Sequence, residues 1–490
     1  MVNILKSLRL GIWVLVAVGA SGCAGVEERL AASRMNDAAA QSCVAVFRGV
    51  DQAVAPVADA ETVRIAGFPY LRINRLLASH ANTARSGPAF NAWVGRMRAL
   101  ARTARSVELA NLPTKTRHNI KSSVARLEEC ARLLQTHDLA DDRGRQILRD
   151  TATVPDHYNT FARVAGLYPL TSVPIWLGYK HLRRSQQRDF KTGLGTGKAI
   201  TFAPKLAAFD TTVVGDLMRQ IKRDKLGLPV LSPGDRELIL NAFAPFYRVG
   251  YKSRDDRIGL PVYTKTDALE VDVKDPVVFR RIAFTQIGNK THLQLVYTAF
   301  FPARTSAGPL DLFAGNLDGL IWRVTLNKVG RPIIYDSIHP CGCYHLFFPA
   351  RPQRLKPEIA NAAFGEPPLA PTPGPVPASG QRIRLLLKPG THYLAGVELT
   401  KEAGAAKTTP YRLVDENVLR SLPTSAGNRR SLYGPDGIVV QSARPERFLL
   451  WSMGVASAGA MRQWGGHATA FIGRRHFDDP FLFDKFLTQQ

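Results

Sequence analysis

Two cysteines and two histidines alternate within one short segment, IHPCGCYHLF, at residues 338–347. They are His339, Cys341, Cys343 and His345. In an extended chain successive side chains point to opposite faces, so these four would share one face. Thiolate and imidazole groups together suit zinc or copper. The segment therefore predicts a metal site with zinc or copper as its cofactor, provided that Pro340 and Gly342 allow the chain to bend around one ion.

Three other interpretations of this segment remain open. Cys341 and Cys343 could form a disulfide, whose very small ring would be strained and readily reduced. Alternatively, one thiol is a nucleophile, and Cys343 with His345 as its activating base is then the candidate catalytic pair. In the last interpretation the thiols and histidines are structural. The sequence leaves open whether the protein is an enzyme.

Further titratable side chains could complete such a site from other strands. The histidines are His292, His467 and His476, and the aspartates are Asp311, Asp318 and Asp336. Taken singly, each is interpreted as a solvated or structural residue. The segment 462–480, RQWGGHATAFIGRRHFDDP, combines Trp, His, Arg and paired Asp and is expected to bind or close over a site.

The N-terminal segment has the layout of a secretory signal. Lys6 and Arg9 precede a short apolar run at residues 10–18, which is followed by small residues. The run is well short of the roughly 20 residues that cross a bilayer, so it predicts a signal peptide over residues 1–22.

The end of this signal resembles the lipobox of bacterial lipoproteins, which is matched by Ala20-Ser21-Gly22-Cys23. Ala20 occupies a position where Leu is commonest. The resemblance implies that Cys23 becomes the acylated N-terminus, because several acyl chains on one residue anchor durably where one chain binds only marginally. Ala24 and Gly25 resemble the pattern for sorting to the outer membrane. We therefore expect a lipid-anchored outer-membrane protein that faces the periplasm.

The charge balance indicates which partners to expect. The 490-residue chain carries 65 Lys and Arg against 40 Asp and Glu, a net charge of +25. For an exported protein this charge favours an anionic lipid, lipopolysaccharide or cell-wall polymer, and no nucleic acid is expected. A generally basic amino-acid composition of the host's proteins would explain the same excess of Lys and Arg equally well.

Cys43 and Cys130 are the remaining cysteines once the lipid and cluster positions are assigned. Both fall in helical stretches of a chain expected in an oxidising compartment, so they are candidates for a disulfide. Two buried free thiols are the alternative.

The periodicity of the chain predicts an α+β protein. Apolar residues at spacings of three and four predict an α-helical bundle at residues 23–190, and residues 191–244 form a connecting region. Short strands with tight turns predict an antiparallel sandwich or barrel at residues 245–490, and Gly288-Asn289 predicts the turn of one hairpin in this domain. A proline-rich loop at 365–380 interrupts this domain, and residues 448–451 are expected to add a strand.

Residues 161–179, FARVAGLYPLTSVPIWLGY, are apolar apart from one Arg. Pro169, Pro174 and Arg163 argue against a regular spanning helix, so a buried connection is expected here. An interfacial segment that dips into the membrane is the second interpretation.

The function predicted from sequence is a periplasmic outer-membrane lipoprotein with a His/Cys metal or thiol site in its β-rich domain. One alternative is a non-catalytic envelope protein whose basic helical domain contacts anionic lipid, lipopolysaccharide or cell wall. The other is a cysteine-dependent envelope hydrolase or transferase.

Overall fold

The computed structural model describes residues 30, 33–205, 210–401 and 408–488. The chain divides into two compact units. The first comprises Met1–Ala58 and Thr62–Val154, and the second comprises Asp59–Glu61 and Pro155–Gln490. The signal segment and Cys23 lie outside the described residues. The first unit ends at Val154, well before residue 190, where the sequence places the end of the helical domain.

The first unit consists mainly of helices, with one small hairpin. Its elements are α2 (Ala38–Val54), β1 (Val63–Ile65), β2 (Phe68–Ile73), α3 (Arg75–Ala78), α4 (Gly87–Asn111), α5 (Thr114–Asn119), α6 (Lys121–Asp138) and α7 (Asp142–Thr151). The apolar stripe of α4 is buried, as its spacing predicts, with Phe90, Trp93 and Met97 in the core. A disulfide joins Cys43 of α2 to Cys130 of α6, with the Cα atoms 5.0 Å apart.

The second unit is built on one ten-stranded sheet. Its strands, in spatial order, are β11 (Leu346–Pro349), β10 (Pro332–Ile338), β9 (Gly315–Leu326), β8 (Lys290–Arg304), β7 (Val277–Ile287), β14 (Thr409–Asp415), β3 (Ala199–Pro204), β4 (Phe246–Gly250), β12 (Gln381–Leu387) and β13 (Leu394–Lys401). Three pairings are parallel, namely β14 with β7, β14 with β3, and β12 with β4. The sheet is therefore mixed, and the expectation of a purely antiparallel sandwich or barrel is not met.

Small antiparallel ribbons accompany the large sheet. They pair β5 (Leu260–Tyr263) with β6 (Leu269–Asp272), and β15 (Leu422–Pro423) with β16 (Arg429–Arg430). Within the large sheet, the predicted hairpin between β7 and β8 is confirmed. Gly288 and Asn289 both adopt positive φ in its turn, as the two central residues of a type I′ turn must.

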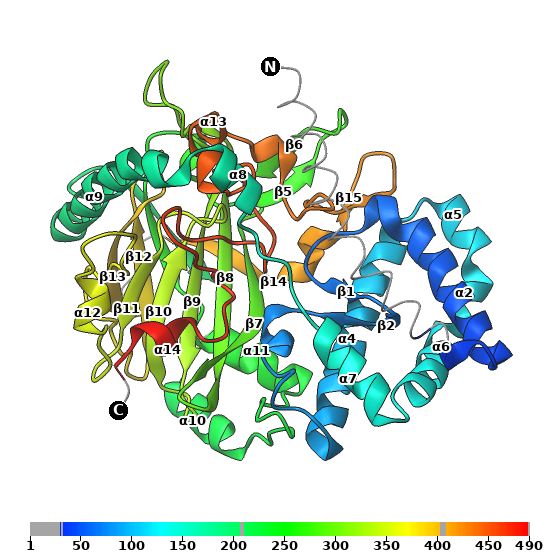
Figure 1. Ribbon diagram of the computed structural model, residues 1–490. Helices are drawn as coiled ribbons and strands as arrows, with labels where there is room; N and C mark the ends of the chain where they lie inside the picture. Colours follow the sequence, from blue (N-terminus) through cyan, green and yellow to red (C-terminus); the bar gives the residue numbers. More distant parts are fainter. Residues whose placement is uncertain (1–29, 31–32, 206–209, 402–407, 489–490) are drawn as a thin grey trace, which may run out of the picture. The chain divides into compact units, whose positions relative to one another are not determined.

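The two faces of the sheet bury different sets of side chains. Along β9, Trp322 and Val324 enter the main hydrophobic core, whereas Arg323 lies on the opposite face. Strands near both ends of the sheet contribute to the same main core, so the sheet curls around it (Figure 1). A C-terminal segment ending in α14 (Leu482–Phe486) covers part of the opposite face, where Phe483 and Leu487 pack against Ile334.

The second unit also contains helices, and two segments of it differ from the sequence expectation. The helices are α8 (Thr160–Ala165), α9 (Tyr168–Thr192), α10 (Thr211–Gln220), α11 (Pro233–Ala242), α12 (Pro357–Ala360), α13 (Glu446–Leu450) and α14. The strand expected at 448–451 is wrong, because these residues belong to α13 and the 3₁₀ turn that follows it, Trp451–Met453. The apolar stretch 161–179 is not a buried connection, since α8 and α9 expose much of it. Among the described residues no helix is long and apolar enough to cross a membrane.

The short segment Asp59–Glu61 is the part of the early chain that belongs to the second unit. The buried guanidinium of Arg420 donates to both oxygens of Asp59, at 2.6 and 3.0 Å. Arg281 pairs with Glu61 at 3.1 Å. These ion pairs hold the segment within the second unit, although its neighbours along the chain belong to the first.

Candidate functional site

The His/Cys segment forms the turn between β10 and β11. The amide of His339 donates to the carbonyl of Cys343 at 3.0 Å, and that of Gly342 donates to the carbonyl of His339 at 2.8 Å. Gly342 has φ +94°, and an added Cβ would lie 2.4 Å from the carbonyl oxygen of Ala468. The chain therefore reverses here instead of running on extended, and only glycine fits at its tightest point.

This reversal separates the four predicted metal ligands. His339 Nδ1 lies 3.2 Å from Asp318 Oδ1, whereas His345 Nε2 lies 2.9 Å from Asp336 Oδ2. In the described part of the chain, no group of three or more His, Cys, Asp or Glu side chains is arranged to hold a metal. The structure therefore does not bring His339, Cys341, Cys343 and His345 into one site.

Asp318 is the centre of a buried polar cluster. Its oxygens lie 3.2 Å from His339 Nδ1 and 2.8 Å from His392 Nδ1, and they accept a hydrogen bond of 3.3 Å from Arg444. Burial alone would raise the pKa of Asp318, but its contacts with His339, and then with His392 and Arg444, hold that pKa well below its usual range. Asp318 is therefore a permanent carboxylate.

His392 lies between two carboxylates. Its Nδ1 faces Asp318, and its Nε2 is 3.4 Å from Asp256 Oδ1. The ring also stacks on Phe301, with centroids 3.9 Å apart. Burial opposes the charged ring, yet the hydrogen bonds and charges of Asp256 and Asp318 raise the pKa of His392 above its ordinary value. We interpret His392 as a partner of these two carboxylates that keeps its positive charge to higher pH than a free imidazole does.

His339 differs from His392 although both contact Asp318. Burial lowers the pKa of His339, and Asp318 offsets this only in part. Its Nε2 has no hydrogen-bond partner among the described residues. The rings of Tyr344 and Tyr393 surround it at 4.9 and 5.7 Å, and Arg304 donates to both tyrosine hydroxyls at 3.1 and 3.0 Å. His339 is thus a neutral imidazole in an aromatic enclosure.

The thiols of Cys341 and Cys343 contact each other in the same turn. Both are free cysteines, Cys341 buried and Cys343 half-buried. A hydrogen bond from Cys343 lowers the pKa of Cys341 against the effect of burial, and the charge of Arg444 adds to this. The same hydrogen bond, with burial, raises the pKa of Cys343 well above its ordinary value. The pair therefore releases its first proton more readily than an isolated thiol and holds the second more tightly.

Charged side chains flank this thiol pair. Arg462 is buried, and its Nε donates to the carbonyl of Cys341 at 3.3 Å. Glu446, at the start of α13, is buried as well, and desolvation raises its pKa to about 7 despite the positive charges of Arg444 and Arg304. Its charge in turn raises the pKa of both thiols. Gly459 gives Glu446 its space, since an added Cβ would lie 2.0 Å from Oε1.

His345 belongs to a separate ion-pair cluster. Arg323 donates to both oxygens of Asp336, at 2.8 and 2.5 Å, and its guanidinium lies 3.7 Å from the ring centroid of Phe477. Burial lowers the pKa of His345 to about 4, so its ring is neutral. Its second nitrogen, Nδ1, has no hydrogen-bond partner in the described chain. His345 therefore makes no hydrogen bond with the thiols, and the structure gives no support to its candidate role as their base.

The remaining sequence candidates lie in several places. His292 Nδ1 is 3.2 Å from the carbonyl oxygen of Leu326, His476 lies 3.1 Å from Asp156, and burial lowers the pKa of His467 to about 3. Asp311 accepts hydrogen bonds from the amides of Ala307 and Phe313 in the loop between β8 and β9.

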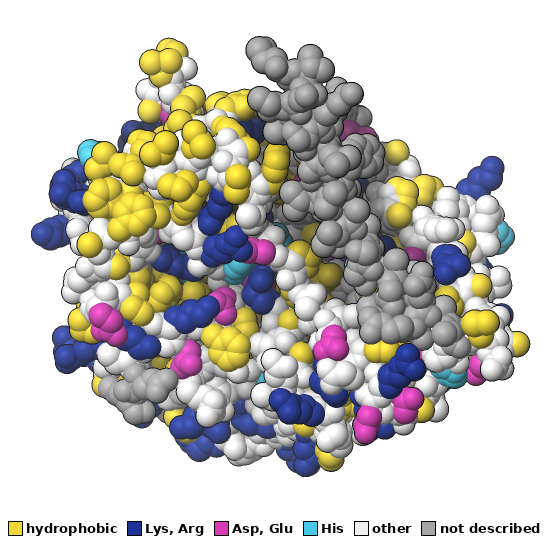
Figure 2. All heavy atoms as spheres, viewed as in Figure 1, with side chains coloured by type: hydrophobic (Ala, Val, Ile, Leu, Met, Phe, Trp, Pro, Cys, Tyr) yellow, Lys and Arg dark blue, Asp and Glu magenta, His cyan; other side chains and the backbone are white. Residues whose placement is uncertain are grey.

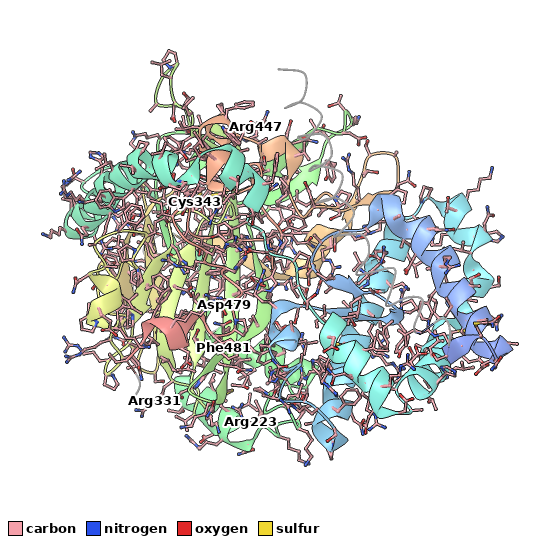
Figure 3. The ribbon with its side chains drawn as sticks, in the orientation of Figure 1. Arg223, Arg331, Cys343, Arg447, Asp479 and Phe481 are labelled. Carbon is pink, nitrogen blue, oxygen red and sulfur yellow. A yellow bond between two sulfur atoms is a disulfide. The ribbon has the colours of Figure 1, made fainter. Side chains whose placement is uncertain are left out.

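Sequence reasoning missed His392, Asp256, Arg444 and Glu446. His392 follows a Pro-Gly turn, a local signal that could have drawn attention to it, but Arg444 and Glu446 belong to no motif. Cys343 lies toward the same end of the sheet as Arg447 of α13, while Arg223 and Arg331 lie toward the other end (Figure 3). No protein-family model, curated protein or solved structure matches the chain.

Proposed function

We propose that the chain is a lipid-anchored protein of the bacterial outer membrane whose Cys341–Cys343 pair exchanges electrons with disulfides in the periplasm. The observation that carries this proposal is the hydrogen bond between the two thiols beside two buried guanidinium groups, Arg444 and Arg462. A thiolate in an electropositive site is the reactive form of cysteine. The anchor rests on the lipobox resemblance at Cys23 alone.

The proposed exchange runs in two steps. Once the pair has lost its first proton, one proton remains between the sulfurs, and transfer of that proton to Cys341 leaves a thiolate on the half-buried Cys343. This thiolate attacks a partner disulfide, forming a mixed disulfide and releasing one partner thiolate. Cys341 then loses its proton and attacks Cys343 Sγ, which releases the second partner thiolate. Two electrons pass to the partner, whose disulfide becomes two thiols once it has taken up two protons.

Glu446 suits the second step. Its pKa of about 7 means that it is partly deprotonated near neutral pH, so it can accept the proton that Cys341 loses. Its electrostatic coupling to both thiols supports its placement beside them.

The other interpretations of the thiols receive less support from the geometry. A cysteine hydrolase needs a histidine against its nucleophile. Within residues 338–347, all described, the nitrogens of His339 and His345 that do not face an aspartate have no hydrogen-bond partner. A zinc or copper ion held by the two sulfurs without these histidines stays a prediction. The metal content of the same purified protein tests it.

The experiment equilibrates the full chain with glutathione buffers of graded ratio and then alkylates the thiols for mass spectrometry. We expect Cys341 and Cys343 to pass together between dithiol and disulfide, while Cys43–Cys130 stays oxidised as an internal control. Cys341→Ser should stop at a mixed disulfide with glutathione, because the attacking thiol of Cys343 is retained. Cys343→Ser keeps only the buried thiol of Cys341 and should stay reduced. Two thiols that stay reduced and unreactive at every ratio would indicate a structural pair, and stoichiometric metal in untreated protein would favour the metal site.

The anchor is tested separately by Cys23→Ala. This variant is expected to leave the membrane fraction or to remain unprocessed. If it stays membrane-bound with the mass of the wild type, Cys23 is not lipidated.

A further inference from the structure

Helices α8 and α9 present large apolar side chains to solvent. Together with α13, the 3₁₀ turn after it and the β8–β9 loop, they form what we call the apolar face. Its members are between 45% and 91% exposed: Phe161, Val164, Leu167, Leu170, Val173, Leu177, Leu310, Phe448, Leu449 and Trp451. On α9, Leu170, Val173 and Leu177 recur at spacings of three and four, so they lie on one side of the helix.

The opposite side of α9 is apolar too. Tyr168 and Ile175 pack against a buried cluster that includes Leu450 and Met453. A surface helix of a soluble protein normally has one apolar stripe and one polar side. Since its inner stripe already provides the packing that holds α9 in place, the outer stripe is not needed for that packing.

Several contacts join the parts of the apolar face into one surface. The amide of Asn159 donates to the carbonyl of Gly454 at 2.7 Å, and Arg163 Nε donates to the carbonyl of Met453 at 2.8 Å, which ties α8 to the turn after α13. The amide of Glu446 donates to the carbonyl of Leu312, which places the β8–β9 loop beside α13. Figure 2 shows hydrophobic side chains gathered over α8, α9 and α13, with Lys and Arg around them.

The margin of the apolar face is basic. Exposed cations on α9 and α13 supply this charge, among them Lys180, Arg184, Arg188 and Arg447. Lys180 lies over the ring of Trp176 at 4.4 Å, and Arg447 lies over that of Phe448 at 4.7 Å. Asp189, the acidic residue of α9, is buried and pairs with Lys388 at 2.7 Å.

We infer that the apolar face docks on an anionic phospholipid surface, with its apolar side chains among the acyl chains and its basic margin at the headgroups. Exposed apolar patches rimmed by polar residues mark membrane or protein contacts, and a helix that combines a Lys/Arg margin with Trp, Phe and Leu is typical of one that lies in the membrane interface. Each basic residue near an anionic leaflet adds attraction that apolar contact alone lacks. The thiol pair lies toward the same end of the sheet, so docking would hold it near the bilayer.

The test reconstitutes the full chain into vesicles of phosphatidylethanolamine and phosphatidylglycerol that carry bromine on their acyl chains. Bromine quenches tryptophan fluorescence on contact, and the Trp451 signal is the difference between wild type and Trp451→Phe. The variant Leu170→Asp/Leu177→Asp removes two exposed members of the face, and Arg184→Glu/Arg188→Glu reverses its margin. Val213→Asp/Val230→Asp, at exposed valines outside the face, is the matched control.

We expect quenching of Trp451 in wild type and control, and at least a fivefold loss in both face variants, with unchanged melting temperatures. Vesicles of phosphatidylcholine should reduce the quenching to a similar extent. Equal quenching in wild type and face variants would overturn the inference, as would equal quenching on neutral and anionic vesicles. It would also be overturned by a dimer that dissociates in the Leu170→Asp/Leu177→Asp variant without any quenching in the wild type, since the occupant would then be a second copy. A failure of the thiol exchange leaves all these outcomes unchanged.

Discussion

Arg444 donates a hydrogen bond to the buried carboxylate of Asp318, and its positive charge also lowers the pKa of Cys341. One guanidinium thus connects the Asp318 cluster to the thiol pair. Because His392 and His339 also face Asp318, the position of Arg444 depends on a carboxylate that is itself held from three directions. This connection gives the thiol pair a fixed electrostatic environment.

Replacing Arg444 by Met should make the thiol pair less acidic. Without the positive charge, the apparent pKa for the first ionisation should rise by about one unit. The pH dependence of iodoacetamide alkylation measures it. Arg447→Met, at an exposed position of α13, should leave the profile unchanged, and Arg444→Lys should largely restore it. An unaltered profile in Arg444→Met would contradict the electrostatic role.

Glu446→Gln should alter thiol reactivity only where Glu446 is ionised. In the wild type the carboxylate that forms above about pH 7 raises the pKa of both thiols, so the rise of alkylation rate with pH is dampened there. The Gln variant should lack that inflection and react faster than wild type above pH 7. Identical rate profiles would show that Glu446 does not affect the thiols.

The stability of the second unit should fall as the pH rises past neutrality, in part because of His392. Its folded-state pKa is raised, so its contribution is complete below about pH 6.5 and is lost as the pH rises through the folded-state value. Urea unfolding between pH 5.5 and 9 measures the slope, which should be shallower in His392→Gln. The comparison is made in a Glu446→Gln background. The raised pKa of Glu446 also makes the free energy of unfolding fall as the pH rises from 4.5 to 7, which would overlap with the effect of His392.

Asp336→Asn should destabilise the protein by about 3–5 kcal/mol, because Arg323 would keep its buried charge without a carboxylate. Chemical denaturation measures this change. The control is Asp216→Asn, which breaks an exposed pair with Arg219 and should cost less than about 1 kcal/mol. Similar losses of unfolding free energy in the two variants would show that burial of the Arg323–Asp336 pair does not increase the cost of breaking it.

Removing the disulfide by Cys43→Ser/Cys130→Ser should destabilise the first unit by about 4–5 kcal/mol, because the bond closes a loop with a sequence separation of 87 residues. Thermal unfolding followed by circular dichroism measures the change. Wild type treated with reductant should lose a similar amount. If neither differs from the oxidised wild type, the bond does not contribute to stability.

Local signals predicted the elements that depend on neighbouring residues. The hairpin at Gly288-Asn289 and the buried stripe of α4 follow from turn chemistry and periodicity, and the structure confirms both. The parallel pairings of β14 and β12 join strands far apart in sequence, which no local pattern encodes. The alternation at 339–345 predicted one face, but the pairing of Asp336 with Phe347 commits the chain to reverse between them.

The Asp318 cluster could not be predicted because its members come from five separate places in the chain. Asp256, Asp318, His339, His392 and Arg444 meet only after the sheet has formed. The expectation that the apolar run of α8 and α9 is buried was wrong for a different reason. Apolar composition favours burial, but α8 and α9 expose much of this run to solvent, and the membrane docking inferred above would require the same composition.

The ion pair between Asp59 and Arg420 sets a limit on how the protein can be divided. A fragment that begins at Pro155 would contain the whole large sheet, yet it would lack residues 59–61. Arg420, 2% exposed, would then be a buried cation with no carboxylate from this segment, and Arg281 would lose Glu61. Cleavage near Val154 should therefore yield two pieces that stay associated, and the C-terminal piece produced alone should be insoluble unless the missing tripeptide is supplied.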